Sequence, residues 1–189
     1  MGGIVHTLSG GTVDYCYLEG QLSSPQLGGI ANSVAGGTIL NCYVNALDAL
    51  LTATGASSVV GGIAATLTSG AIKNSFVKEV AINRVNDGTL GGIVGTVSGG
   101  RIVNCYAYES NNTFYGSRTS GTLTNCYLVG GSQNRVTSVT SEVAASSDAS
   151  TGLTAILNKN RTTDASSLSP QLNGSRAWVL TDGTPILSN

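Results

Sequence analysis

The side chains of this chain that could do chemistry begin with its cysteines, of which there are four. They occupy one position, or slot, of a sequence phrase that recurs in five copies along the chain. In the five copies this slot holds Cys16, Cys42, Ser75, Cys105 and Cys126. If the copies stack as parallel strands about 4.8 Å apart, equivalent Cα atoms come within disulfide range, but their Cβ atoms point the same way. We therefore expect buried free thiols that fill space, with Cys16–Cys42 or Cys105–Cys126 disulfides as the alternative. We expect no metal site, because the chain has a lone His6 and no Cys-x-x-Cys.

Carboxylates are the second group that could carry a reaction, and the ten acidic residues are scattered. Polysaccharide lyases and hydrolases built on β-helices assemble their sites from acids on adjacent rungs, but no slot of the phrase carries an acid in two neighbouring copies. The acids of the repeat region lie in or near free slots and loops: Asp14, Glu19, Asp48, Glu79, Asp87 and Glu109. No phosphate-binding Gly-x-x-x-x-Gly-Lys-Ser/Thr and no calcium-binding nonapeptide occurs. We therefore expect no catalytic residue, no cofactor and no enzymatic activity.

One slot is aromatic in every copy, and it is the candidate binding surface. It follows the cysteine slot directly, so if the thiols face inward, the alternation of a strand turns these rings outward in a column. Such a column could stack on sugar rings or dock a protein partner. Alternatively, the rings stack on one another or lie beneath loops. The residues are Tyr17, Tyr43, Phe76, Tyr106 and Tyr127.

These side chains would be positioned by a repeat of two short strands. Each copy reads Gly-Gly-Ile, a hydroxyl and an apolar residue, further glycines, and then Ile-x-Asn-Cys-Tyr; the copies start at Gly2, Gly28, Gly61, Gly91 and, much altered, Asn112. Short β-rich runs bounded by glycines predict strands, and the internal glycines predict a corner. Asn tolerates left-handed backbone geometry and can bond to its own backbone, so the Asn before each cysteine predicts a bend that turns both Ile and Cys inward. These residues are Asn41, Asn74, Asn104 and Asn125, with Tyr15 in the first copy.

Fixed self-similarity of this kind predicts a repeat architecture, in which each unit buries its apolar face against its neighbours. The slots at 16, 42, 75, 105 and 126 lie 26, 33, 30 and 21 residues apart. Each copy would make one coil with two regular strands, and stretches such as 45–58 and 78–89 would supply a third strand and loops. Parallel strands joined by crossovers of one sense favour right-handed winding. We predict an all-β protein: a right-handed parallel β-helix (solenoid) of about five coils over residues 1–131.

After Gly131 the phrase stops, and residues 132–189 are expected to form a small cap over the last coil, as solenoids require. Within this segment, Leu153, Ile156 and Leu157 have the spacing of one short amphipathic helix. The end of the chain, from Trp178 to Leu187, reads as strand, turn and strand, and it contains the single tryptophan.

Composition limits the partners and the setting. Only 10% of the 189 residues are charged and the net charge is −1, so neither a nucleic-acid footprint nor a polybasic membrane patch is present. No apolar run is long enough for direct membrane insertion, and no signal peptide is seen. Because Met1 stands directly before a glycine pair of the first repeat, we expect the chain to be part of a larger polypeptide whose export signal lies elsewhere.

The repeat resembles the GLUG motif, whose copies read Gly-Gly-Leu-Val-Gly followed by Gly-Gly-x-Ile-x-Asn-Cys-Tyr. The match is best over residues 91–107 and extends over 2–128, and Trp178 with residues 182–187 is similar to a segment that often ends such arrays. The resemblance implies a β-helix in a secreted or cell-surface bacterial protein, typically an adhesin. Some relatives are immunoglobulin-cleaving metalloproteases with a separate catalytic domain, but this chain has no His-Glu-x-x-His, so that activity does not carry over. Ser75, Tyr15 and the altered fifth copy depart from the pattern.

Every strongly constrained slot has a structural explanation. We therefore expect a non-enzymatic structural or adhesive module that presents a rigid surface, with a host glycan or an extracellular protein as its partner. Two alternatives stay open. A carbohydrate-binding or polysaccharide-degrading β-helix module would bring two or three carboxylates together with Lys or Arg in a groove. A fibre segment of the kind that phages carry would form a stable trimer.

Overall fold

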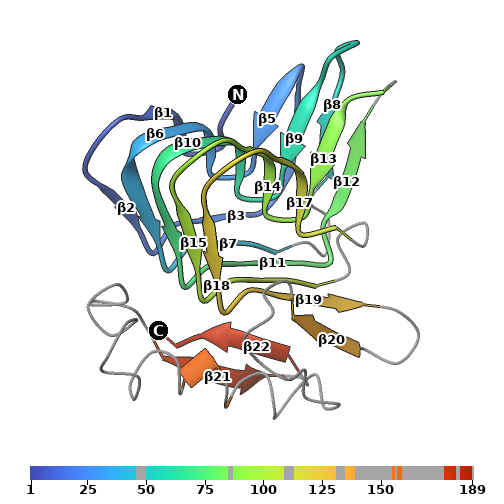
Figure 1. The fold of residues 1–189 in the computed structure, drawn as a ribbon. Helices are drawn as coiled ribbons and strands as arrows, with labels where there is room; N and C mark the ends of the chain where they lie inside the picture. The colour runs from blue at the N-terminus through green and yellow to red at the C-terminus, as the bar shows by residue number, and fades with distance from the viewer. Residues whose placement is uncertain are drawn as a thin grey trace.

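The computed structural model describes residues 1–45, 50–84, 87–108, 113–130, 135–138, 155, 157–158, 177–181 and 184–188. Within these residues the chain is an all-β parallel β-solenoid of about three turns, whose backbone winds round a continuous apolar core (Figure 1). The repeat architecture predicted from the sequence is confirmed at this level.

Two sheets of parallel strands carry the residues of the phrase. The first sheet has the order β1 (Val5–Leu8), β6 (Ala31–Leu40), β10 (Ala64–Lys73), β14 (Val94–Val97) and β17 (Tyr115–Arg118). β6 and β10 run through the glycine corner with register shifts, and the strands that start after it are β2 (Thr12–Asp14), β15 (Arg101–Val103) and β18 (Thr122–Thr124). The strands after the cysteine slot form the second sheet: β3 (Tyr17–Leu18), β7 (Tyr43–Asn45), β11 (Phe76–Lys78), β16 (Tyr106–Tyr108) and β19 (Tyr127–Gly130), with β20 (Arg135–Ser138) antiparallel to β19.

The side of variable length carries two strands per turn, where the sequence analysis expected one. One three-stranded sheet consists of β4 (Gln21–Ser24), β8 (Leu50–Ala53) and β12 (Ala81–Arg84), and another of β5 (Gln26–Gly28), β9 (Val59–Gly61) and β13 (Thr89–Gly91). Two strands form because each turn has two separate apolar residues that point inward on this side, such as Leu51 and Val60 in the second turn. With three strands in each of these sheets, about three turns are complete on every side.

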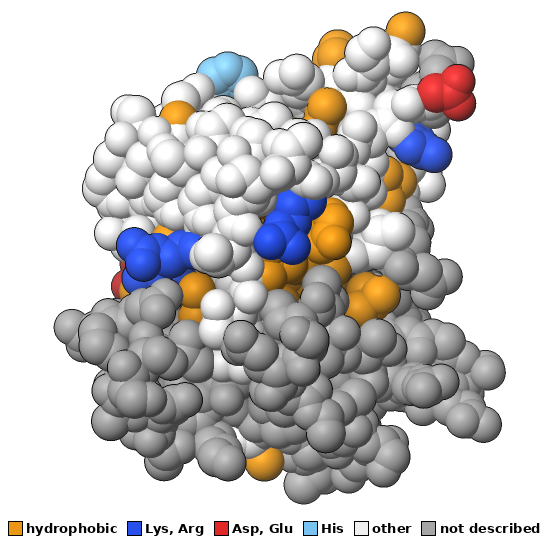
Figure 2. Space-filling view, in the orientation of Figure 1, with side chains coloured by type: hydrophobic (Ala, Val, Ile, Leu, Met, Phe, Trp, Pro, Cys, Tyr) orange, Lys and Arg blue, Asp and Glu red, His pale blue; other side chains and the backbone are white. Residues whose placement is uncertain are grey.

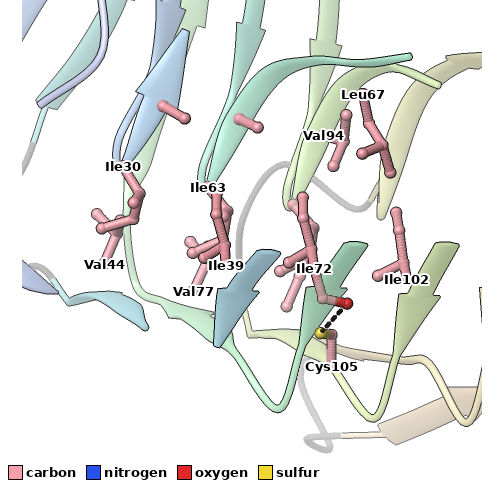
Figure 3. Close-up of a cluster of buried hydrophobic side chains, with 14 of the residues drawn as sticks. Ile30, Ile39, Val44, Ile63, Leu67, Ile72, Val77, Val94, Ile102 and Cys105 are labelled. Carbon is pink, nitrogen blue, oxygen red and sulfur yellow. Dashed lines mark hydrogen bonds between the residues drawn. The ribbon is translucent and has the colours of Figure 1, made fainter. Parts of the chain in front are cut away.

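Equivalent residues of successive copies lie directly above one another. The second-strand column is in register throughout, from Val13 through Ile39, Ile72 and Ile102 to Leu123. At the start of the phrase, the N–H of Ile30 donates to the carbonyl of Ile63, and that of Ile63 to Ile93, both at 2.9 Å. The isoleucine side chains of Figure 3 fill the core without solvent exposure. Each such buried side chain stabilises the fold by about 1.5–3 kcal/mol, so the repeated apolar slots are the main source of stability.

The second glycine of each opening pair is required by the close approach of neighbouring coils. A Cβ on Gly29 would lie 2.2 Å from the carbonyl oxygen of Gly62, and a Cβ on Gly62 would lie 2.1 Å from that of Gly92. No side chain fits at such distances. At the predicted corner, Gly70 and Gly100 have φ angles of +81° and +71°, in the left-handed region that glycine adopts readily.

The C-terminal segment contributes an antiparallel hairpin of β21 (Trp178–Thr181) and β22 (Thr184–Leu187). The two strands predicted there are confirmed, the predicted turn at 182–183 lies outside the described residues, and Figure 1 shows the strand pair beside the last turns of the solenoid. The helix predicted from Leu153, Ile156 and Leu157 falls mostly outside the described residues; residues 155, 157 and 158 are described and have helical backbone, which is too little to define a helix. Leu157 itself is described, and its side chain is buried among aromatic residues of the second sheet.

Candidate functional site

The five aromatic residues proposed as a binding surface form one ladder on the second sheet. They pair in register from β3 to β19, because each follows the cysteine slot and the next residue of each strand points toward the core. The rings of Tyr17 and Tyr43, of Tyr43 and Phe76, and of Phe76 and Tyr106 are nearly parallel, with centroids 5.1, 5.0 and 5.2 Å apart. Stacked aromatic pairs attract one another by about 0.5–1.5 kcal/mol, so the ladder stiffens this sheet.

Among these five rings, solvent reaches only those of the first two copies. Tyr17 is 52% exposed and Tyr43 is half-buried, whereas Phe76 is 2% exposed and Tyr106 and Tyr127 are fully buried. The buried rings pack in one cluster with residues of the C-terminal segment: Leu157, Trp178 and Leu187. The accessible part of the candidate binding surface is therefore the stacked pair Tyr17 and Tyr43.

Trp178 is the residue that covers the middle of the ladder. Its indole ring lies 5.7 Å from the ring of Phe76 and 5.5 Å from that of Tyr106, tilted by 58° and 55°. The side chain of Asn158 holds its backbone: Asn158 Nδ2 donates to the Trp178 carbonyl at 2.7 Å, and the Trp178 N–H donates to Asn158 Oδ1 at 2.8 Å. The contact thus combines ring packing with directed hydrogen bonds, which fix the place where the C-terminal segment lies.

The asparagine slot forms a second ladder, which is buried. Asn41, Asn74, Asn104 and Asn125 have φ angles of 53°, 47°, 56° and 50°, and Tyr15 has 50°, so the predicted left-handed bend is confirmed. The amides also bond across coils: Asn104 Nδ2 donates to Asn74 Oδ1 at 2.8 Å, and Asn74 Nδ2 to Asn41 Oδ1 at 2.9 Å. The first coil ends the ladder with a carboxylate, because Asn41 Nδ2 donates to Asp14 Oδ1 at 2.8 Å.

The amide ladder was missed by the sequence analysis, which expected each Asn to bond to its own backbone. A signal for it was present, since a polar residue kept in one slot of four copies between two inward-facing residues is itself placed to be buried. The position of Trp178 was also missed. Its signal was weaker: one of the two rings on which it packs, Phe76, lies in the copy that has Ser75 and Phe76 in place of Cys and Tyr.

The cysteine slot faces the core, and all four cysteines are free. Burial raises the pKa of the Cys42 and Cys105 thiols to about 12. Cys105 Sγ lies 3.3 Å from the carbonyl oxygen of Val103 and 3.8 Å from that of Ile72, the contact drawn in Figure 3. Ser75 keeps the same role, since its hydroxyl donates to the Lys73 carbonyl at 2.7 Å and accepts from the Cys42 N–H at 3.1 Å. These groups are core filler, as expected, because a nucleophile or metal ligand needs a thiolate.

The open end of the aromatic ladder has a polar surround. Burial, followed by the charges of Tyr15, Tyr17 and Glu19, raises the pKa of Tyr43, so the carboxylate of Glu19 acts on the same ring pair. Glu19 is exposed directly after β3. A phenol hydroxyl can donate a hydrogen bond, and a carboxylate can accept one. Flat apolar rings beside such groups suit the faces and hydroxyls of a sugar, or a polar protein surface.

The remaining candidate chemistry is dispersed. Glu79 lies 4.0 Å from Lys78 in the one ion pair between described residues, Asp14 binds the asparagine ladder, and Asp48 and Glu109 lie outside the described residues. No group of three or more potential metal ligands occurs in the described parts of the chain. His6 is exposed in β1, in the first turn. Over the same residues, no helix is both long and apolar enough to cross a bilayer.

Comparisons of the chain with known protein families, with curated proteins and with solved structures gave no match. The resemblance to the GLUG motif therefore depends on the residues of the phrase alone. What the structure adds is the parallel β-solenoid that the resemblance implied.

Proposed function

We propose that this chain is a non-enzymatic structural or adhesive module of a secreted or cell-surface bacterial protein, of the GLUG-motif type. The observation that supports it is the aromatic ladder: three rings are sealed under the C-terminal segment, while Tyr17 and Tyr43 stay stacked and open to solvent. A rigid rod with one accessible ring pair suits the display of a binding surface. The partner would be a host glycan or an extracellular protein.

The finer description of the scaffold belongs to the same proposal. We infer right-handed winding, which parallel crossovers favour. The five copies would form five coils over residues 1–131, of which the last is shortened on the variable side, and residues 132–189 would form the cap. In a larger polypeptide, such a rod would hold its ends at a set spacing while the open rings face outward.

A carbohydrate-binding module is the second candidate, and the position of Glu19 beside the ring pair favours it. Sugars bind where an aromatic face covers their C–H groups and polar side chains take their hydroxyls. A polysaccharide-degrading site would need a second carboxylate at the same place to act as acid or base. Glu19 is the carboxylate whose charge acts on the Tyr43 ring, so binding is the better supported half of this alternative.

The experiment is a screen of the intact chain against immobilised glycans and extracellular matrix proteins, repeated with Tyr17→Ala and Tyr43→Ala. Loss of an aromatic anchor typically costs more than about 1 kcal/mol, so each variant should bind about five- to tenfold more weakly. Tyr17→Phe keeps the ring and should lose less. Ile4→Ala, which removes another exposed apolar side chain of the first turn, is the matched control and should bind normally. If the unmodified chain binds none of the immobilised ligands, only the role of a spacer would remain.

A further inference from the structure

The glycine corner of the middle coils carries positive charge that is not paired with any acid among the described residues. Arg101 begins β15 in register with Ala71, and Lys73 ends β10 in register with Val103, so the two cations lie on adjacent coils. Arg101 is exposed and Lys73 is half-buried. Neither forms an ion pair with a described residue. Burial lowers the pKa of Lys73, and the positive charge of Arg101 lowers it further, so the two cations repel each other.

A hollow of about 560 Å³ opens at this corner. It spans four successive strands, β6, β10, β15 and β18, and its lining consists of Gly36, Ser69, Gly70, Gly100, Arg101 and Thr122. The hollow exists because three of these residues have no side chain. Its remaining walls offer the guanidinium group of Arg101 and two exposed hydroxyls, from Ser69 and Thr122, which are all hydrogen-bond donors.

The nearby charges of the described residues leave this corner positive, although the whole chain has a net charge of −1. Arg118 adds a third cation at the next corner, where its Nη2 donates to the Gly121 carbonyl at 2.8 Å. Among the described residues, Asp14 is the acid on this side, but Leu40 separates it in register from Lys73, so it lies two coils, or about 10 Å, away. Figure 2 shows Lys and Arg side chains on this face against a surface that is mostly uncharged.

We propose that this hollow is a binding site for an anionic group, the carboxylate or sulfate of an acidic saccharide. The planar fork of Arg101 can donate two parallel hydrogen bonds to such an oxyanion. The hydroxyls of Ser69 and Thr122 supply further donors, and Lys73 adds positive potential from the adjacent coil. The site shares no residue with the Tyr17–Tyr43 pair, so it does not depend on the function proposed above.

The test measures binding by titration calorimetry with three probes at low ionic strength: a sulfated or carboxylated oligosaccharide, its neutral counterpart, and inorganic sulfate. The acidic oligosaccharide should bind, and its affinity should fall as salt is raised from about 10 to about 150 mM, because exposed charges are screened. Arg101→Gln should weaken binding about tenfold, since hydrogen bonds between charged groups are lost. Lys73→Gln should weaken it by a smaller factor, about threefold.

Three variants keep the test selective. Lys78→Gln removes a cation that already pairs with Glu79 and should bind as the unmodified chain does. Arg101→Lys keeps the charge but loses the fork, so its affinity should fall between that of the unmodified chain and that of Arg101→Gln, provided that circular dichroism shows the same fold. Tyr17→Ala should leave anion binding unchanged. The site would be overturned if the folded Arg101→Gln variant bound the acidic oligosaccharide as tightly as the unmodified chain does. It would also be overturned if the neutral oligosaccharide bound as tightly as the acidic one. Binding of inorganic sulfate alone would overturn its assignment to a saccharide.

Discussion

The indole Nε1 of Trp178 donates a hydrogen bond of 2.7 Å to the side-chain Oδ1 of Asn74, although the two residues are 104 positions apart. The same oxygen accepts the amide of Asn104 at 2.8 Å. The bond joins the buried asparagine ladder to the C-terminal hairpin, and both partners are almost fully buried. A buried donor that lost this acceptor would pay its full desolvation cost. The C-terminal segment is thus held at one particular coil of the solenoid.

Trp178→Ala should detach the C-terminal hairpin and expose the middle of the aromatic ladder. Truncation of a buried Trp typically costs about 3–5 kcal/mol, and the ring contacts with Phe76 and Tyr106 would be lost. The free energy of unfolding, measured by urea titration followed by circular dichroism, should fall by this amount. Binding of a hydrophobic dye should rise as Phe76 becomes accessible. Trp178→Phe is the control: it keeps an aromatic ring and loses the hydrogen bond, so a loss equal to that of the alanine variant would contradict the importance of ring packing.

The asparagine ladder can be separated from the backbone bend that it accompanies. Asn74→Gly keeps the left-handed geometry but removes the amide that bonds to Asn41, Asn104 and Trp178. Buried partners left without hydrogen bonds cost about 1–3 kcal/mol, so the free energy of unfolding should fall by that much more than in the control. The matched control is Asn125→Gly, which has a similar φ of 50° and no side-chain hydrogen bond to a described residue. Equal losses in the two variants would mean that the ladder contributes nothing beyond backbone geometry.

The parts of the fold that could be predicted from the sequence are those that repeat. A fixed offset between the isoleucine and cysteine slots predicted the register, and the structure stacks Ile39, Ile72 and Ile102 accordingly. The left-handed bend at Asn74 was predictable because it is a backbone preference of one residue type. The second strand of the variable side was not predicted, although its apolar residues Leu27, Val60 and Leu90 directly precede the first glycine of a copy, because each copy was taken to begin at that glycine.

The parts of the candidate site that could not be predicted depend on contacts between the repeat and a segment that does not repeat. Alternation placed Tyr17 and Phe76 on the same outward face, and both lie in one ladder. Which of these rings meets solvent depends on where Trp178 packs, and no periodicity of the sequence specifies that position. The hydrogen-bond partners of the Asn74 side chain could not be predicted either, since backbone propensity does not specify which neighbour an amide will bond.

Gly62→Ala tests the close approach of neighbouring coils. The new Cβ would lie 2.1 Å from the Gly92 carbonyl oxygen and 2.7 Å from a methyl carbon of Val77, so the coils would have to separate. We expect a loss of more than about 3 kcal/mol in the free energy of unfolding, or failure to fold, since strain of this kind is among the causes of large effects. Gly10→Ala is the control, because a Cβ there would meet nothing within 4 Å. A folded Gly62→Ala chain with an unchanged urea midpoint would disprove the packing argument.

The thiols of the core predict how stability changes at high pH. Burial raises the pKa of Cys42 and Cys105 to about 12, from 9.0 in an exposed thiol. Between these values the unfolded chain loses thiol protons that the folded chain keeps, so the folded state is disfavoured as pH rises. The free energy of unfolding should therefore decline from about pH 9 to about pH 12. It should not change from this cause below about pH 8.

Alkylation at pH 8 reports the same burial without extreme conditions. Iodoacetamide reacts with thiolates, so Cys16, which is half-buried, should react before Cys42, Cys105 and Cys126, which are buried. Labelling of the last three should proceed only through unfolding and should accelerate with urea along the unfolding curve. Tandem mass spectrometry of the tryptic peptides identifies the modified residue, with fragmentation needed to separate Cys16 from Cys42 because both lie in the peptide of residues 1–73. Labelling of Cys105 in the absence of urea at the rate of Cys16 would show that the thiol column is open to solvent, and the stacking of the coils round a closed core would then be wrong.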